Sequence, residues 1–353
     1  MGRRSAAALL AHWGDIHQVW SASVAQWAQV IGPVAAHRLS DTPDATFLQR
    51  QDAAWRWLQG HDGLDLGTRQ LVTWADDAYP QALTRMPDPP LVLYVCGTPD
   101  AWQQRPCLAI VGSRNPTAQG MDHARHFARA LSEGGWVIAS GLALGVDGAA
   151  HEGALAASGP TVAVVGTGPE SIYPRKHIGL AQRIVRGGGA IISEYAPGTP
   201  VRSENFPLRN RIIAGLSLGT LVVEAALESG SLITAKLAVE SGREVFAIPG
   251  SIHSPHSKGC HALIRQGAKL VETAADILEE FSPGVFADAR GDAATASIHD
   301  TLPALGHDPF TLDALSQRTG QSVAEVAAWL LELELQGQIA RLPGGLFQRR
   351  TPL

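Results

Sequence analysis

The 353-residue sequence has few cysteines, few charged residues and no long apolar run. Its three cysteines, Cys96, Cys107 and Cys260, form no CxxC pair, so neither a disulfide framework nor a zinc site is indicated. Charged residues make up 17% and hydrophobic residues 45% of the chain, which argues against general disorder and suits a folded core. Because no apolar stretch of about 18 to 20 residues lacks a charge, we expect no transmembrane helix and a cytoplasmic protein. The length of 353 residues suggests two or three domains.

The sequence also lacks an excess of positive charge. The formal net charge of −5 argues against a protein that coats nucleic acid through bulk positive charge. Residues 108–280 are charge-balanced and are the least acidic part of the chain, and their basic side chains cluster. The clusters are Arg175, Lys176, Arg183 and Arg186, and then Arg202, Arg209 and Arg211. A site for a polyanion is therefore expected as a local pocket in this part of the chain.

The common nucleotide and metal motifs are missing. The chain has no P-loop, and its first strand is followed by Gly112-Ser113-Arg114 rather than by GxGxxG. The second strand ends at Ser140-Gly141 with no acidic residue, so we expect neither a nicotinamide nor a flavin cofactor. The histidines around Cys260 match no common zinc spacing, and no metal is expected.

From residue 108 onward, short apolar runs alternate with helical stretches. This alternation predicts an α/β fold, a Rossmann-like parallel sheet covered by helices on both faces. The strands are expected at residues 108–111, 136–139, 162–165, 190–192, 220–223 and 244–248, and the helices near 118–132, 145–157, 175–186, 208–216, 231–241 and 257–266. Polar loops at residues 112–114, 205–211 and 228–236 flank these strands, so the sheet should bring all three to one edge.

The flanking segments predict further domains. Apolar positions at helical spacing, broken by Gly14, Pro33 and Pro43, predict a small helical domain at residues 1–70. Residues 30–39 are similar to a helix-hairpin-helix turn, which leaves a DNA phosphate contact and a plain packing role both open. The Rossmann-like domain is expected at residues 71–282, where the proline-rich lead-in suits an edge strand.

The C-terminal part changes character. Small residues predict a linker at residues 283–300, and residues 301–353 predict a winged-helix domain. Glu325, Glu332 and Glu334 lie on or beside its second helix, which favours a protein-interaction module over a reader of duplex DNA.

Six motifs in order over about 180 residues resemble one family. They are residues 111–114, 140–151, 173–174, 193–195, 205–217 and 224–235. Together they are similar to the DNA-processing protein A family (DprA, also called Smf). This resemblance implies a single-stranded DNA-binding recombination mediator of natural transformation, which protects incoming DNA and loads the RecA recombinase. It also implies a homodimer and a binding protein rather than an enzyme.

The resemblance and the residue chemistry together predict a DNA site. Arg114 offers a planar fork for phosphate oxygens, and Phe206 among basic residues suits base stacking. The predicted DNA-binding residues are Gly112, Ser113, Arg114, Ser140, Gly141, Lys176, Arg202, Asn205, Phe206, Arg209, Asn210, Arg211, Ser231, Thr234 and Lys236. Family members often carry a basic residue just before the phenylalanine, where this chain has Ser203 and Glu204, so Arg202 must supply that charge.

Several of these residues have an alternative, structural interpretation. Phe206 could be a core residue, and Arg209 and Arg211 could pair with Glu194 or Glu204. Asp147 and His151 lie four residues apart in a helix, and a structural hydrogen bond between them is preferred to a catalytic pair.

The alternative function is that of a nucleotide phosphoribohydrolase of the lonely-guy type. Those enzymes carry a glycine-rich loop with a glutamate, whereas the matching stretch here keeps Glu224 and Glu228 but has Ala225-Ala226-Leu227 between them. The enzyme interpretation is therefore disfavoured.

Overall fold

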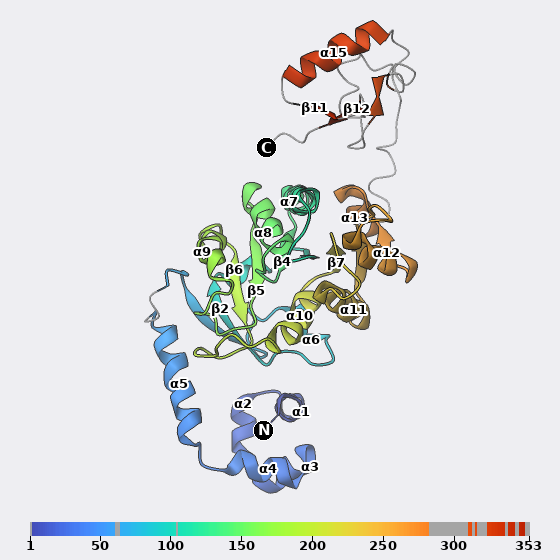
Figure 1. Cartoon of the computed structure of the whole chain (residues 1–353). Coiled ribbons are helices and arrows are strands. Elements are labelled where there is room, and N and C mark those ends of the chain that lie inside the picture. Colours follow the sequence, from blue (N-terminus) through green and yellow to red (C-terminus); the bar gives the residue numbers. More distant parts are fainter. Residues whose placement is uncertain are drawn as a thin grey trace. The chain divides into compact units, whose positions relative to one another are not determined.

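The computed structural model describes residues 2–60, 64–103, 105–281, 310–312, 315, 323–335, 338–342 and 346–349 (Figure 1). The chain divides into two compact units, residues 1–282 and 283–353. The expected linker at residues 283–300 lies outside the described residues. None of the described helices is long and apolar enough to cross a membrane.

A nine-stranded sheet organises the first unit. Its order is β1-β2-β6-β5-β4-β3-β7-β8-β9, and the seven strands from β6 to β9 run parallel. The strands are β1 (Arg69–Thr73), β2 (Val92–Gly97), β3 (Cys107–Val111), β4 (Val137–Ser140), β5 (Thr161–Val164), β6 (Ala190–Ser193), β7 (Gly219–Val222), β8 (Glu244–Ala247) and β9 (Lys269–Leu270). The predicted parallel sheet is confirmed, and the proline-rich lead-in adds β1 and β2 as an antiparallel edge.

Both faces of the sheet are buried, as the continuous apolar runs predicted. Along β3, Leu108 and Ile110 pack in one core, while Cys107, Ala109 and Val111 pack in the other. The first face carries α7 (Ala118–Glu133), α8 (Val146–Ala156), α9 (Ile178–Arg186) and α13 (Ala274–Phe281). The second carries α6 (Gln81–Thr84), α10 (Asn205–Leu216), α11 (Gly230–Glu240) and α12 (Lys258–Arg265), and Figure 1 shows α8 and α10 on opposite sides of the strands.

The strand order reverses between β3 and β7. From β3 the chain adds β4, β5 and β6 on one side, and then returns to place β7, β8 and β9 on the other side. In open α/β sheets, ligands bind in the crevice outside the carboxyl ends of the strands at such a switch point. The loops after β3 and β7 are therefore the place to look for a site.

The first unit begins with five helices: α1 (Arg3–Trp13), α2 (Ile16–Ser21), α3 (Val24–Ile31), α4 (Pro33–Ser40) and α5 (Ala45–Leu58). Leu9, Val19, Trp27 and Ala36 form a small core among the first four. The turn that resembles a helix-hairpin-helix joins α3 to α4 through Gly32, whose φ of 81° suits glycine. Whether this turn contacts DNA stays a prediction.

In the described part of the second unit, a three-stranded antiparallel sheet packs against helix α15. The strands are β10 (Phe310–Thr311), β11 (Ile339–Leu342) and β12 (Leu346–Arg349), and the helix is α15 (Val323–Leu335). Trp329, Leu330 and Leu333 of α15 share a core with Ile339 and Phe347 of the sheet. A helix on a short ribbon is the arrangement expected of a winged helix.

Candidate nucleic-acid interface

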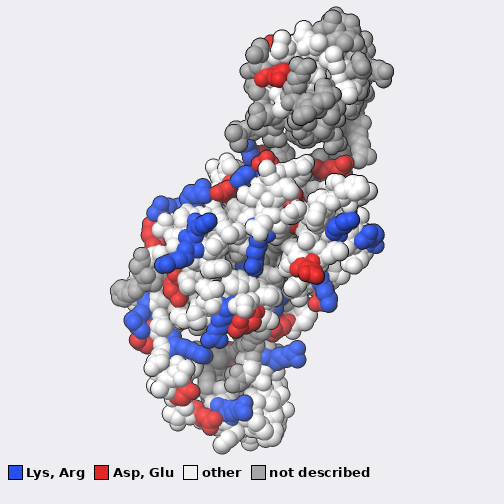
Figure 2. Space-filling model, in the orientation of Figure 1, with Lys and Arg blue, Asp and Glu red and all other residues white. Residues whose placement is uncertain are grey.

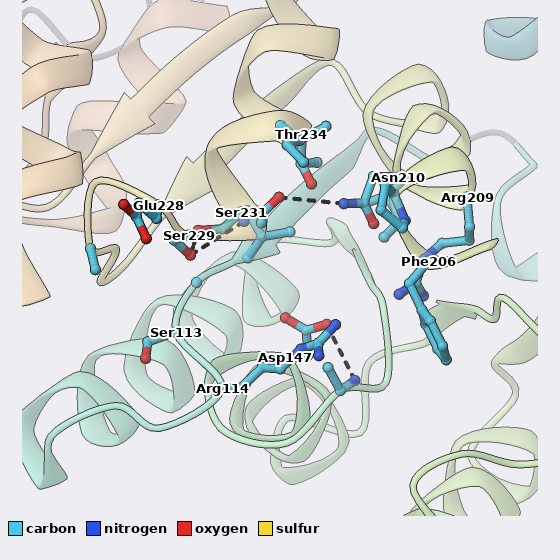
Figure 3. A pocket seen from close by; sticks show the side chains of 18 of the residues that line it. Ser113, Arg114, Asp147, Phe206, Arg209, Asn210, Glu228, Ser229, Ser231 and Thr234 are labelled. Carbon is cyan, nitrogen blue, oxygen red and sulfur yellow. Dashed lines mark hydrogen bonds between the residues drawn. The ribbon is translucent and has the colours of Figure 1, made fainter. Parts of the chain in front are cut away.

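A cavity of about 490 Å³ opens at the carboxyl ends of β3 and β7. Its wall comes from the loop after β3, the loop before α8, the first turns of α10 and the start of α11 (Figure 3). The predicted residues that line it are Gly112, Ser113, Arg114, Phe206, Arg209, Asn210, Ser231 and Thr234. The three polar loops thus meet at one edge of the sheet, at the topological switch point.

The loop that carries Arg114 is held by backbone contacts on both sides. The Ser113 amide donates to the Glu224 carbonyl at 2.7 Å, and the Val146 amide donates to the Ser113 carbonyl at 3.1 Å. Gly145 has a φ of 79°, and a Cβ there would lie 2.4 Å from the Ser113 oxygen. Glycine is therefore required for this close approach. The side chain of Arg114 itself is exposed beside the cavity.

Phe206 forms an aromatic and cationic cluster at the cavity. The guanidinium carbons of Arg114 and Arg209 lie 5.9 Å and 6.0 Å from its ring centroid. Tyr173, which is half-exposed, lies 5.7 Å from the same ring, centroid to centroid. Phe206 itself is only partly buried. An accessible ring beside a free arginine is the arrangement that single-strand binders use for a base and its phosphate.

Arg209 lines the cavity, but its side chain is buried. Its side chain is 3% exposed and donates to the Gly141 carbonyl at 2.7 Å and to the Val164 carbonyl. Burial lowers the pKa of Arg209 to about 10, against the opposing effect of the nearby Asp147 carboxylate. A Cβ at Gly141 would lie 2.7 Å from both Arg209 and Asp147, so glycine makes room for this charged pair. Arg209 therefore joins β4, β5 and α10.

Arg211 points to a different part of the molecule. Its Nη2 lies 2.6 Å from both carboxylate oxygens of Glu194, and its Nε lies 3.7 Å from Asp88. The side chains of Arg211 and Glu194 are each 10% exposed. The expected pairing with Glu194 is confirmed for Arg211, and its phosphate contact stays a prediction.

The other predicted residues lie outside the cavity lining. Ser140 is fully buried and donates to the Ile110 carbonyl, and Asn205 donates to the Gly166 carbonyl at 3.0 Å. Lys176 is exposed, and Lys236 is 79% exposed and lies 3.8 Å from Glu240. Gly141 lies behind Arg209, and Arg202 lines a neighbouring groove. A DNA contact from any of these residues stays a prediction.

The start of α11 supplies a hydroxyl-rich side of the cavity. Ser229 caps the helix by accepting from the Ser231 amide, and the two hydroxyls are 2.7 Å apart. The Asn210 amide nitrogen donates to the Gly230 carbonyl at 3.5 Å and so links α10 to α11. Hydroxyls and helix-terminal amides together form a polar surface that favours an anion.

Four polar side chains in the cavity lining and one neighbour of Phe206 were not among the predicted DNA-binding residues. They are Asn115, Asp147, Glu228 and Ser229 in the lining, and Tyr173 against the ring. Asn115 directly follows the motif of residues 111–114, so extending that motif by one position would have included it, whereas the other four lie inside recognised motifs.

The predicted hydrogen bond between Asp147 and His151 is wrong. Asp147 instead accepts from the amides of Gly141 and Ala143 at 3.1 Å and 3.3 Å, and His151 pairs with Thr161 at 2.8 Å. Burial raises the pKa of the Asp147 carboxyl, while Arg209 and these amides oppose the shift. The two side chains diverge because Asp147 turns back over the loop before α8, whereas His151 packs into the sheet.

The acid at the end of β7 has a structural role. Glu224 accepts from the Thr117 amide at 2.9 Å and from the Thr117 hydroxyl at 2.6 Å, at the start of α7. A carboxylate at a helix N-terminus is favoured by the helix dipole.

Over the face in Figure 2, basic and acidic side chains are interspersed. Local geometry rather than bulk charge must therefore select a polyanion here.

Comparisons with known proteins now decide the family. Residues 70–282 match the family described as DNA recombination-mediator protein A, and residues 287–345 match the DprA winged helix domain. The chain belongs to the DprA/Smf family. It is 42% identical to Protein Smf of Escherichia coli (strain K12) over 298 residues, which cover 81% of this chain and 79% of that protein.

Solved structures of the DprA/Smf family share this architecture. The X-ray structure of DprA from Streptococcus pneumoniae has a TM-score of 0.67 and 37% identity, over 80% of this chain and 94% of that one. A structure of DprA from Helicobacter pylori, described as showing a single-stranded DNA binding mode, has a TM-score of 0.55 and 30% identity. It covers 62% of this chain and 97% of the other. The chain therefore has the DNA-processing, recombination-mediator role of this family, and the phosphoribohydrolase alternative is not favoured.

Proposed function

We propose that this DprA/Smf protein binds single-stranded DNA in the cavity at the carboxyl ends of β3 and β7. The observation that carries the proposal is the exposed Arg114 beside the partly exposed ring of Phe206. Arg114 holds a phosphate, and Phe206 stacks an adjacent base. The single-stranded DNA binding mode described for the Helicobacter pylori relative supports the same ligand class.

The cavity favours a single strand over a duplex for a geometric reason. The bases of a duplex are stacked within the helix, so their faces cannot reach a ring such as that of Phe206. A single strand can splay one nucleotide into a local pocket and place its phosphate on one arginine. Tighter binding to duplex DNA than to single strands at equal salt would contradict this proposal.

The mediator role of the family supports two partners for this chain. The protein loads the RecA recombinase onto the bound strand and acts as a homodimer in the cytoplasm, protecting incoming DNA during natural transformation. RecA-dependent strand exchange on DNA coated with a single-strand binding protein tests the loading. Sedimentation at several concentrations tests the dimer.

The protein acts by binding and catalyses no reaction of its own. The Glu224 carboxylate, the candidate for base release, is already occupied by the amide and hydroxyl of Thr117. Ala225, Ala226 and Leu227 replace the glycine loop that would let a nucleotide approach this backbone. The chain also has no P-loop, the glycine-rich phosphate cradle of one large class of ATPases.

The decisive experiment compares Arg114→Ala with Arg129→Ala in single-strand binding at several salt concentrations. Loss of one phosphate contact should flatten the slope of log K against log salt by about 0.7 for a single strand. Arg129 is the control because it is exposed on α7, pairs with Glu133 and does not line the cavity. An unchanged slope for Arg114→Ala would show that Arg114 does not hold a phosphate.

A further inference from the structure

A second groove lies directly beside the cavity. It has a volume of about 530 Å³ and runs between helix α5 and the loop of residues 194–205. From α5 it is lined by Thr46, Gln49, Arg50 and Ala53, and from the loop by residues that include Tyr195, Arg202 and Asn205. Asn205 lines the groove and its neighbour Phe206 lines the cavity, so both hollows border the start of α10.

The groove contains two arginines whose charges are not neutralised within the described part of the chain. Arg50 and Arg202 are exposed, and neither guanidinium forms a salt bridge or hydrogen bond to a described residue. By contrast, Arg56 on the same helix pairs with Asp52 at 2.9 Å. Two exposed cations that line one groove attract an anion into it.

The acids near the groove have other partners. Glu194 lines the groove, but Arg211 holds its carboxylate at 2.6 Å. Glu170, which accepts from the Gly198 amide at 2.7 Å, and Glu204, 3.4 Å from the Ser203 hydroxyl, are not lining residues of the groove. Positive charge therefore dominates the open part of the groove, and the ring of Tyr195 adds an aromatic surface. Cations with an aromatic side chain are the usual composition of a single-strand path.

Helix α5 is anchored so that Arg50 stays at the groove. Trp57 is 2% exposed and packs edge-on against Tyr94 of β2, with a centroid separation of 5.7 Å. Arg50 precedes Trp57 by seven residues, or about two helical turns, so both lie on one side of α5. The helical N-terminal part of the chain thus contributes a side chain beside the DNA cavity.

We propose that this groove is a second phosphate subsite, in which Arg50 and Arg202 hold the backbone of the strand whose neighbouring nucleotide occupies the cavity. The proposal rests on single-strand binding at Arg114 and Phe206. It extends the path of the strand from the cavity, past Phe206, to α5. Positions 203 and 204, just before Phe206, are Ser203 and Glu204 and carry no positive charge. In this proposal, Arg202 and Arg50 of α5 supply that charge instead.

The test compares binding of oligothymidylates of about 4 and about 16 nucleotides, the range of site sizes known for single-strand binders. The variants are Arg50→Ala, Arg50→Glu and Arg202→Ala, with Arg56→Ala as the control on the same helix. On the longer strand, Arg50→Ala and Arg202→Ala should each flatten the salt slope by about 0.7. Arg50→Glu should weaken binding further than Arg50→Ala. On the shorter strand, which the cavity can hold alone, Arg50→Ala should bind as well as the wild type.

The outcomes distinguish a failure of the proposed subsite from a failure of the proposed DNA binding in the cavity. If Arg114→Ala weakens both strands while the Arg50 and Arg202 variants match Arg56→Ala on the longer one, the groove is not a DNA subsite. It would then serve another ligand, such as a peptide. If the wild type binds neither strand, both the proposed function and the subsite are wrong. Circular dichroism of each variant verifies that α5 and the core remain folded.

Discussion

Replacing Arg211 by methionine should reduce stability and leave the DNA contacts in place. Arg211 and Glu194 are each 10% exposed in their side chains and are held at 2.6 Å, with Asp88 at 3.7 Å. Removing one partner of a buried ion pair leaves the other charge in a poorly solvated site, which costs about 3 to 5 kcal/mol. Such a loss is a large part of the total stability of about 5 to 15 kcal/mol that is typical of a folded domain.

Urea unfolding of the wild type and of Arg211→Met measures this change. Arg129→Met is the matched control, because the pair of Arg129 and Glu133 is similarly short at 2.8 Å but more than half exposed. An exposed pair should contribute about 1 kcal/mol or less. The double variant Arg211→Met with Glu194→Gln should recover part of the loss, since no buried carboxylate then remains at position 194.

The same variants decide between the two roles of Arg211. If Arg211→Met unfolds at the wild-type urea concentration but flattens the salt slope of single-strand binding by about 0.7, Arg211 contacts a phosphate and the structural interpretation is refuted. If stability falls and the salt slope of single-strand binding by the folded protein is unchanged, Arg211 has the structural role of holding α10 in place.

Two further predictions concern buried or engaged groups. Burial lowers the pKa of His151 from 6.5 to about 3, so the folded protein keeps the ring neutral while the unfolded chain binds a proton. Stability is therefore lost as the pH falls below 6.5. Between pH 7.5 and 5, urea unfolding should show that the wild type loses about 2 kcal/mol more of its free energy of unfolding than His151→Gln does. Equal losses would show that His151 is not buried as a neutral ring. For Glu224, long incubation with purine and pyrimidine monophosphates should release no base, and release that disappears in Glu224→Gln would overturn the non-catalytic proposal.

The sheet could be predicted from the sequence because its signal is local. A parallel strand that is buried on both faces is largely apolar, and β3, β5 and β7 are fully buried runs of this kind, with one threonine each in β5 and β7. In a parallel sheet the carboxyl ends of the strands share one edge, so the loops after β3 and before α11 were expected there. The antiparallel edge of β1 and β2 was less clear, because prolines flank a run with no periodic partner in the sequence.

The sequence predicts which side chains of α10 share the face at the cavity, but not how deeply each one is buried. Phe206, Arg209 and Asn210 are spaced i, i+3 and i+4, so they share one face of a helix, and all three line the cavity. Arg211 is five positions from Phe206 and falls on another face, which the spacing alone would have indicated. The depth of each arginine could not be predicted, because it depends on Glu194 and Gly141, which are distant in sequence.

The four arginines predicted to bind DNA therefore divide into buried and exposed ones. Arg209 and Arg211 are buried: the Gly141 and Val164 carbonyls bind Arg209 in the wall of the cavity, and Glu194 binds Arg211 outside the lining, so both fix α10 against the sheet. Arg114 is the cation that remains exposed at the cavity, and a single cation supplies little of the counterion release on which DNA affinity depends. A protein with a net charge of −5 must then gather further cations along the path of the strand. Arg50 and Arg202 in the adjoining groove are placed to supply them, and this requirement links the helical N-terminal part of the chain to the function of the sheet.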